Sequence, residues 1–511
     1  MPVSATRSER SVLSVVRTWL AGGALPPVVH VVLGLILPVV VLCANMWAVH
    51  RFTVDDAYIS FRYARNLVDG HGLVYNPGEY VEGYTNFLWT VLVAAGMKLG
   101  VDPLVTSKVL GAAAAIGKLV AVYALSRRLS PLRQLPCIAT WLLASSSTFS
   151  GYAVFGLETA GFIALVVTAT LLMFREHDDP RAFPWSGLVF ALAGLTRPEA
   201  PMFIGIPMLL LGRGIFARQN LLRAALFAGP VLAHLLWRHS YYGTWTPATL
   251  AAKTGDLAAQ IRSGRNYVAD WMAHTGPVVF FALYGLGLAI SRRQRELATV
   301  VALFAGICVY VVLVGGDWMS FFRFMAPAEP WAALASGVAI RELFATRDRA
   351  AWIALVLFGA WMVPLRITHL EQAHRRWLGE EKKFWDTVAG QTADWLARNE
   401  PGLVAIGDIG YVGYRTNYPL LDLLGLVDPV IGNLPGGYTR KLGAGYKKRV
   451  FGAKPKYIVI VMAGQACDRA TMAGSRMLFG DPRFRRHYRA AHNVQVGSGA
   501  SWCIFERKPK S

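Results

Sequence analysis

Charge is scarce in this sequence. Only 16% of its 511 residues are charged, whereas 54% are hydrophobic. Soluble domains of this length carry about 25% charged residues, so most of this chain must face lipid or the inside of a helical bundle. The composition excludes an ordinary soluble enzyme and predicts a polytopic α-helical membrane protein.

A cleavable leader and a metal-binding cysteine pattern are both missing. The N-terminus is basic, but no small-residue cleavage site follows the apolar run that begins near Val28. None of the five cysteines has metal-ligand spacing. Three lie in apolar runs, as buried thiols do. Cys467 and Cys503 lie in the polar C-terminal part and can pair if that part lies outside the membrane in an oxidising compartment.

The positive charge is not gathered in one block. The net charge of +21 is spread over short arginine clusters, which excludes a nucleic-acid groove and favours loops that set membrane topology. A spanning helix needs roughly 20 apolar residues. Eleven candidate spans centre on 28–50, 104–126, 135–151, 157–174, 184–195, 199–212, 221–238, 277–290, 297–314, 324–340 and 351–368. Several are short, so tilted or half helices are expected.

The arginine clusters either precede the first span or follow an even-numbered one. They are Arg7, Arg10 and Arg17; Arg127, Arg128 and Arg133; Arg175 and Arg181; Arg213, Arg218 and Arg223; Arg292, Arg293 and Arg295; and Arg341, Arg347 and Arg349. All fall on the inner side if the first span runs outward. The C-terminal part then lies outside. The apolar segment from Phe87 to Leu99 is too short to cross and is expected to be interfacial or re-entrant.

The unusual polar residues collect in the outward loops. We expect a substrate cavity there, lined by Tyr58 and Glu82 of the first loop (51–86), Glu158, Arg197, Glu199, Tyr241 and Trp318. Charges near lipid are costly and usually face a cavity. Their convergence predicts one outward-facing polar site built from several loops.

The paired Asp55 and Asp56 open the first loop, in VDDAYISFRYARNLVDGHG. Asp55, Tyr58, Arg62 and Arg65 recur at helical spacing and predict one face of a helix. A carboxylate can act as general base on an acceptor hydroxyl or hold a divalent metal, and arginines bind phosphate bidentately. The alternative is that Asp55 only caps the helix.

Two other loops have both a functional and a structural interpretation. Pro198 should break the helix between Arg197 and Glu199, which then either face a cavity or form an ion pair at a turn. In GGDWMSFFRF, Asp317 and Arg323 lie beside aromatic rings, at a sugar site or in an interfacial belt. Lys253 is a phosphate contact or a snorkelling lysine.

The segment 371–511 predicts a separate α/β domain, because VAIGDIGYVGY, KPKYIVIV and SWCIFERK are typical of strands. Residues 1–370 form the predicted membrane domain. Asp408, Asp422 and Asp428 flank strand ends, where they either touch sugar hydroxyls or cap turns.

Taken in order, the motifs DDAYISFRYARNLVDGHGLVYNPGEYVEGYT, GLET, TRPEA, YYGTWTPATLAAK, GGDWMSFFRFMAP and LLDLLGLVDPVI resemble the GT-C membrane glycosyltransferases. Within these the chain is most similar to the mycobacterial terminal arabinofuranosyltransferases. The C-terminal domain is shorter than theirs, and DDAYISFRYA is closer to the wider bacterial pattern.

The resemblance implies a GT-C fold and transfer of arabinofuranose from a polyprenyl-phosphate donor to an envelope glycan. Asp55 and Asp56 match the catalytic pair. The positions matching the donor side are Arg62, Arg65, Lys253, Asp317 and Arg323. The expected location is the bacterial plasma membrane, with the C-terminal domain, a candidate glycan-binding unit, outside. The alternatives are a protein O-glycosyltransferase and a flippase, which should show internal repeats.

Overall fold

A computed structural model describes residues 23–211, 214, 216–253, 257–436, 441, 443–496 and 499–509. The first half of the membrane domain contains α2 (Pro27–Val31), the π-helix η1 (Val32–Ile36), α3 (Leu37–Val49), α4 (Asp55–Val68), α5 (Phe87–Lys98), α6 (Pro103–Leu129), α7 (Ile138–Ala144), α8 (Ser147–Val154), α9 (Thr159–Asp178), α10 (Ser186–Gly194) and α11 (Ala200–Leu210). Its second half contains α12 (Arg218–Tyr242), α13 (Ala248–Lys253), α14 (Leu257–Thr275), α15 (Val278–Ser291), α16 (Arg295–Val314), the 3₁₀ helix η2 (Arg323–Ala328) and α17 (Glu329–Thr346).

The described part of the chain has six helices long and apolar enough to cross a membrane, or seven if the pair α14 and α15, bent by 95°, is one span. The remaining expected spans are shorter elements. The segment expected at 135–151, for example, is the two short helices α7 and α8. The expected interfacial segment is the short apolar helix α5.

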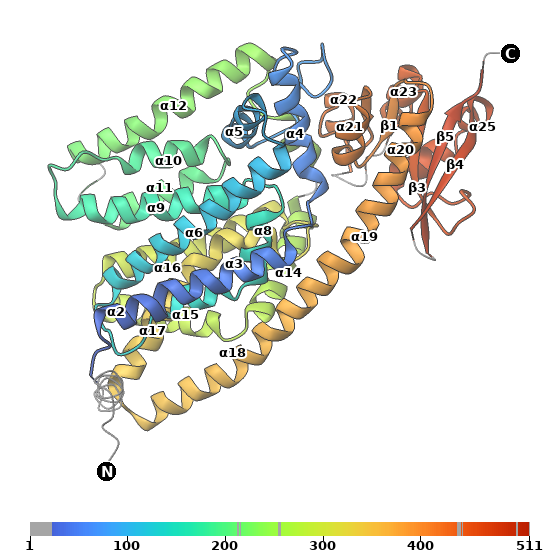
Figure 1. Cartoon of the computed structure of the whole chain (residues 1–511). Coiled ribbons are helices and arrows are strands. Elements are labelled where there is room, and N and C mark those ends of the chain that lie inside the picture. The colour runs from blue at the N-terminus through green and yellow to red at the C-terminus, as the bar shows by residue number, and fades with distance from the viewer. Residues whose placement is uncertain are drawn as a thin grey trace.

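The arginine clusters share one end of this bundle. Arg128, at the end of α6, pairs with Asp178 at 2.7 Å and Glu296 at 2.6 Å, which joins the ends of α6 and α9 to the start of α16. Arg292 and Glu342 join α15 to α17 at 2.8 Å. In Figure 1 this end lies at the lower left, whereas α4 and α5 lie at the opposite end. Arg7, Arg10, Arg17 and Arg213 lie outside the described residues.

One continuous helix of 50 residues, Arg349–Arg398, joins the two parts of the molecule. It consists of α18 (Arg349–Arg375), the π-helix η3 (Arg376–Glu381), α19 (Lys382–Phe384), the π-helix η4 (Trp385–Ala389) and α20 (Gly390–Arg398). At 1.5 Å per residue it is about 75 Å long, more than twice the bilayer hydrocarbon thickness. It runs diagonally past the bundle to the C-terminal domain (Figure 1). The expected boundary at residue 371 falls inside it.

The C-terminal domain is built on a five-stranded mixed sheet in the order β2-β1-β3-β5-β4. Its elements are β1 (Val404–Ile406), α21 (Gly410–Thr416), β2 (Leu420–Asp422), α22 (Pro429–Gly432), α23 (Ala444–Ala453), β3 (Tyr457–Ala463), α24 (Ala473–Phe479), α25 (Pro482–His487), β4 (Tyr488–Val496) and β5 (Ala500–Arg507). β1 pairs in parallel with β2 and β3, and β5 is antiparallel to β3 and β4. β1, β2 and most of β3 are buried, and apart from Asp422 at the end of β2 their residues are apolar, as in a covered parallel sheet.

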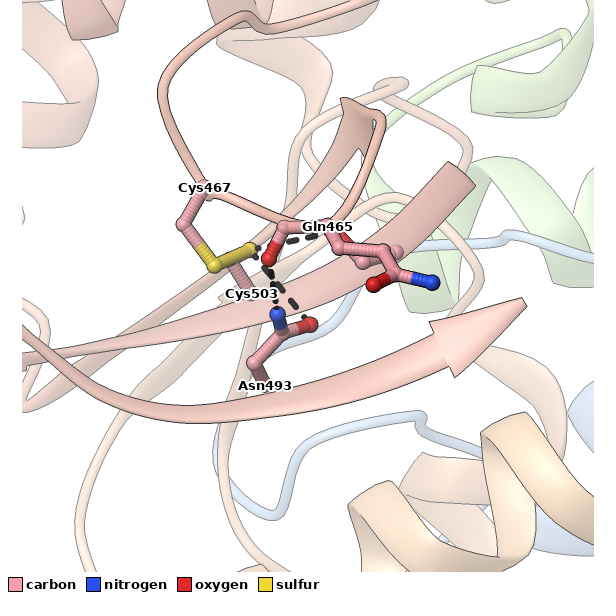
Figure 2. Close-up of a disulfide and its surroundings, with 5 residues drawn as sticks. Gln465, Cys467, Asn493 and Cys503 are labelled. Carbon is pink, nitrogen blue, oxygen red and sulfur yellow. Dashed lines mark hydrogen bonds between the residues drawn. A yellow bond between two sulfur atoms is a disulfide. The ribbon is translucent and has the colours of Figure 1, made fainter. Parts of the chain in front are cut away.

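A disulfide links the loop after β3 to β5. Cys467 and Cys503 are bonded, with their Cα atoms 5.8 Å apart. Asn493 Nδ2 donates to the Gln465 carbonyl at 2.5 Å, so the loop before Cys467 is also held to β4 (Figure 2). Cys43, Cys137 and Cys308 are free thiols.

Candidate active site at the domain junction

The aspartate pair lies at the start of α4. The preceding residue, Val54, is the extended N-cap and makes no side-chain cap bond, so Asp55 and Asp56 are the first two helical residues. The interpretation of Asp55 as a mere helix cap is therefore wrong. The unpaired N–H groups of a first turn favour negative charge.

The Asp55 side chain is held by the C-terminal domain. It is 5% exposed, and its two oxygens accept hydrogen bonds from the backbone N–H groups of Tyr411 at 2.7 Å and Gly410 at 3.0 Å. These donors begin α21. A Cβ on Gly410 would lie 2.0 Å from the Asp55 carbonyl oxygen, so the approach of α21 to α4 requires glycine here.

A third carboxyl group, that of Asp408, comes from the segment between β1 and α21. Asp408 follows β1 and interacts electrostatically with both Asp55 and Asp56. Burial raises the pKa of Asp55 to about 8, and repulsion from Asp408 adds to this more than repulsion from Asp56, while the amide hydrogen bonds oppose it. Burial and then Asp56 raise the pKa of Asp408 to about 6. Asp408 was expected only as a sugar contact or turn cap, because no local signal joins it to residues some 350 positions earlier.

The predicted stripe on α4 exists, and it faces α21. Arg62 is fully buried and donates to the carbonyls of Tyr75 and Gly413, each at 2.8 Å, and of Tyr418 at 2.8 Å. Its Nη2 also donates to Asn76 Oδ1 at 3.1 Å. A guanidinium so occupied is placed to join the two domains, which differs from the phosphate contact expected from sequence.

Arg65 and Tyr58 lie at the same junction. Arg65 donates to the Tyr414 carbonyl at 2.9 Å and to Asn417 Oδ1 at 2.8 Å. The ring of Tyr58 packs edge-on against Tyr411, with centroids 5.0 Å apart. The expected donor and cavity residues of α4 thus contact the C-terminal domain.

The GGDWMSFFRF loop places a second charged group near the pair. Arg323 is 9% exposed; its Nε lies 3.3 Å from Asp317 Oδ2, and it interacts electrostatically with Glu158 and Asp56. Among the described residues its Nε has no hydrogen-bond partner, and Nη1 donates only weakly, to the Met319 sulfur at 2.9 Å. The backbone before it is strained: Phe321 and Phe322 have φ of 61° and 58°. Such strain in non-glycine residues is concentrated at functional sites.

The break at Pro198 forms a buried ion cluster. Arg197 pairs with Glu158 at 2.7 Å and with Glu199 at 2.5 Å. Asn86 Nδ2 donates to the other Glu158 oxygen at 3.0 Å. Burial works to raise the pKa of Glu158, but Arg197 and Arg323 hold it below its ordinary value. The structure thus shows the ion pair at the turn, and this cluster interacts electrostatically with Arg323; that it faces a cavity stays a prediction.

The other expected cavity residues hold the first loop or lie at the surface. Glu82 pairs with Arg238 of α12 at 2.8 Å, and Tyr241 Oη accepts from the Leu73 backbone N–H at 2.9 Å. Trp318 is 58% exposed. Lys253 ends α13, and its side chain lies outside the described part of the structure.

The structure therefore brings two charge clusters together at one end of the bundle. The acidic cluster is Asp55, Asp56 and Asp408, and the mixed cluster is Arg323, Asp317, Arg197, Glu158 and Glu199. Asp56, which is half-buried, interacts electrostatically with Arg323 and with both other acidic-cluster residues. Within the described ranges, no group of three or more His, Cys, Asp and Glu side chains is arranged to hold a metal ion.

Comparison with known proteins matches this chain to one domain family and to two named enzymes. Residues 373–505 match a family described as a domain of unknown function, DUF8728. The chain is 27% identical to the terminal β-(1→2)-arabinofuranosyltransferase of Mycobacterium tuberculosis, over 76% of this chain and 72% of that protein. It is 28% identical to the enzyme of the same name from Corynebacterium glutamicum, over 68% of this chain and 57% of that protein.

Solved structures of two membrane glycosyltransferases share the fold. ArnT from Cupriavidus metallidurans, bound to undecaprenyl phosphate, aligns with a TM-score of 0.57 and 11% identity over 94% of this chain and 98% of ArnT. The Archaeoglobus fulgidus oligosaccharyltransferase aligns with a TM-score of 0.55 and 15% identity over 83% of this chain and 67% of that one. The chain is a multi-pass membrane glycosyltransferase with the GT-C fold, and in sequence it resembles the terminal arabinofuranosyltransferases.

Proposed function

We propose that this enzyme transfers D-arabinofuranose from a polyprenyl-phosphate donor to an envelope glycan, with Asp56 as general base. One observation carries the proposal: Asp56 interacts with the buried guanidinium of Arg323 and lies in a carboxylate cluster at the domain junction. A base beside a phosphate-binding cation is what sugar transfer from a lipid phosphate needs. The names of the two curated relatives support arabinofuranose as the sugar.

The transfer then proceeds with the chain's own groups. Asp56 accepts the proton of the acceptor hydroxyl, and the oxygen bonds to the anomeric carbon of the donor sugar. The bond from that carbon to the phosphate oxygen breaks, and the polyprenyl phosphate leaves with the electron pair. Asp55 holds the first turn of α4 in place through its bonds to Gly410 and Tyr411.

Arg323 is our candidate for the phosphate. A guanidinium binds phosphate bidentately, and Arg323 makes few competing hydrogen bonds among the described residues. Arg197 supports it indirectly, because its ion pairs with Glu158 and Glu199 offset part of their negative charge. The bound undecaprenyl phosphate of ArnT supports a lipid phosphate as the kind of ligand for this fold.

We place the C-terminal domain on the extracytoplasmic side of the plasma membrane. The disulfide between Cys467 and Cys503 supports an oxidising compartment. The arginine-rich end of the bundle lies opposite the candidate site, and basic loops favour the cytoplasm. The acceptor is then a glycan exposed outside the cell.

The test is a transfer assay with the purified full-length enzyme, polyprenyl-phosphate donors carrying arabinofuranose or other sugars, and arabinan or peptide acceptors. We expect transfer of arabinofuranose to arabinan, reduced at least 10³-fold in Asp56→Asn, since the substitution removes the base. Asp394→Asn, on the exposed face of α20, is the matched control and should behave as wild type.

Each other outcome contradicts part of the proposal. Transfer to peptide alone would indicate a protein glycosyltransferase. Transfer from a donor that carries another sugar, and not from the arabinofuranose donor, would show that arabinofuranose is not the sugar transferred. Full activity of folded Asp56→Asn would remove its role as base. Movement of labelled lipid across reconstituted vesicles without any transfer would indicate a flippase.

A further inference from the structure

Asp408 lies at a point of the C-terminal sheet where ligands commonly bind. The chain leaves β1 for β2 on one side and later returns to β3 on the other, so the carboxyl end of β1 is a topological switch point. Ligands of open α/β sheets bind in the crevice at such points. Asp408 lines a small crevice of about 20 Å³ there, together with Lys441, Tyr446 and Trp502. The ammonium of Lys441 is occupied by the carbonyls of Gly432 and Leu434.

Asp408 differs from the other two aspartates at these strand ends. Asp422 accepts hydrogen bonds from the backbone N–H groups of Leu424 at 2.7 Å and Val427 at 3.0 Å. Asp428 accepts from the Ile431 N–H at 3.0 Å and from Arg449 Nε at 2.8 Å. Both therefore cap turns, as aspartates at such positions usually do.

The carboxylate of Asp408 has no such structural partner. Among the described residues none donates a hydrogen bond to it, and its acidic neighbours at the junction are the carboxyl groups of Asp55 and Asp56. Burial and like charge both raise its pKa, to about 6. Asp408 is half-buried, so its carboxylate remains accessible to a ligand. Acids held close together with raised pKa values are concentrated at functional sites.

We propose that Asp408 is a third carboxylate of the active site, which accepts a hydrogen bond from a hydroxyl of the acceptor sugar and so aligns the attacking hydroxyl with Asp56. Asp408 forms no covalent bond and takes no proton in the transfer; the proton of the attacking hydroxyl still goes to Asp56. This inference rests on the proposed function, and it assigns the acceptor side of the site to the C-terminal domain.

The charges of the two substrates indicate which of them Asp408 contacts. The donor phosphate is an anion, and the carboxylates of Asp56 and Asp408 repel it. Arg323, which pairs with Asp317 at 3.3 Å, is a cation near Asp56 that suits the phosphate. A neutral polyol has hydroxyl donors and no charge, so it suits the acidic cluster. Asp408 therefore faces acceptor hydroxyls.

The experiment compares Asp408→Asn with wild type in steady-state transfer, measuring KM for acceptor and for donor separately, together with hydrolysis of the donor by water. Loss of a hydrogen bond to a charged group predicts an acceptor KM raised about 10- to 100-fold. Donor KM and the rate of donor hydrolysis should stay within about twofold of wild type. Asp394→Asn is again the matched control.

Asp408→Glu keeps the charge and moves the carboxylate, so it should also raise acceptor KM and provides a second variant if Asp408→Asn does not fold. Unchanged acceptor KM in folded Asp408→Asn, with Asp56→Asn inactive, would overturn this inference and leave the proposed function standing. Equal loss of transfer and donor hydrolysis would mean a structural role and overturn it too. A wild-type enzyme without transfer would instead overturn the proposed function.

Discussion

Three carboxyl groups meet at this junction, and their environments differ. Both oxygens of Asp55 are held by backbone amides of α21, so its geometry is fixed. Asp56 is half-buried and shares its electrostatic environment with Arg323. Asp408 lacks a donor among the described residues. When neighbouring carboxyl groups have different pKa values, those differences indicate which group acts as an acid and which as a base.

The raised pKa of Asp55 predicts that stability depends on pH. Burial raises this pKa to about 8, so the folded protein keeps the proton to higher pH than the unfolded chain does. The contribution of this group to stability is complete below its ordinary pKa and is lost as pH rises through 8. Each tenfold difference in proton affinity between the folded and unfolded chain corresponds to about 1.4 kcal/mol at most.

We therefore expect the melting temperature of the purified enzyme to fall between pH 5 and pH 9, and the fall to be smaller in Asp55→Asn, which cannot ionise. Thermal unfolding followed in detergent at several pH values measures both slopes. Equal slopes in the two proteins would contradict the assignment of this pH dependence to Asp55.

At the scale of elements, the contact of α21 with α4 depends on two glycines. Gly410 leaves room for the Asp55 backbone, and a Cβ on Gly413 would lie 2.1 Å from Tyr75 Oη. Arg62 then bonds the Gly413 carbonyl, and Tyr75 Oη donates to the Ile409 carbonyl at 2.5 Å. The small residues allow the backbones to approach, and buried polar groups join them.

Gly410→Ala should therefore separate the domains. The added methyl group overlaps backbone and not a flexible side chain, so we expect a loss of about 1–3 kcal/mol in stability and a transfer rate lowered at least tenfold. Thermal unfolding and the transfer assay measure these effects. Gly452→Ala on α23, where no atom lies within 4 Å of the added Cβ, is the control and should be neutral or slightly stabilising. Wild-type behaviour of Gly410→Ala would refute the close contact.

Local periodicity predicted the face of α4 but not its partner. The spacing of Asp55, Tyr58, Arg62 and Arg65 is a local property, and it indicated the correct stripe. The partner α21 begins 355 residues after Asp55, and no sequence pattern specifies that pairing. Arg62 was expected at a phosphate because arginine suits both phosphates and carbonyls, and only the fold decides between them. The continuous helix through residue 371 was hidden by its change from apolar to polar composition.

The whole molecule is polarised, with arginines at one end of the bundle and the carboxylates and the C-terminal domain at the other. This arrangement predicts that the first loop and the loop near residue 216 lie on opposite sides of the membrane. Tyr80 and Phe216 are 53% and 85% exposed and can carry reporter cysteines.

With Cys43, Cys137 and Cys308 replaced by serine, we expect an impermeant maleimide to label Tyr80→Cys in intact cells. Phe216→Cys should react only after the cells are permeabilised. Each variant serves as the control for the other. Labelling in the reverse order would invert the topology and place the candidate site in the cytoplasm.

The continuous helix Arg349–Arg398 separates the two parts of the candidate site in the order of synthesis. Asp408 and the amides that hold Asp55 come after this helix, so a ribosome has made about four-fifths of the chain before they emerge. A nascent chain can insert its earlier spans and still lack the groups that complete the site. If the C-terminal domain lies outside, as proposed, these groups must also cross the bilayer and dock on α4, so an incompletely translocated chain is expected to be inactive.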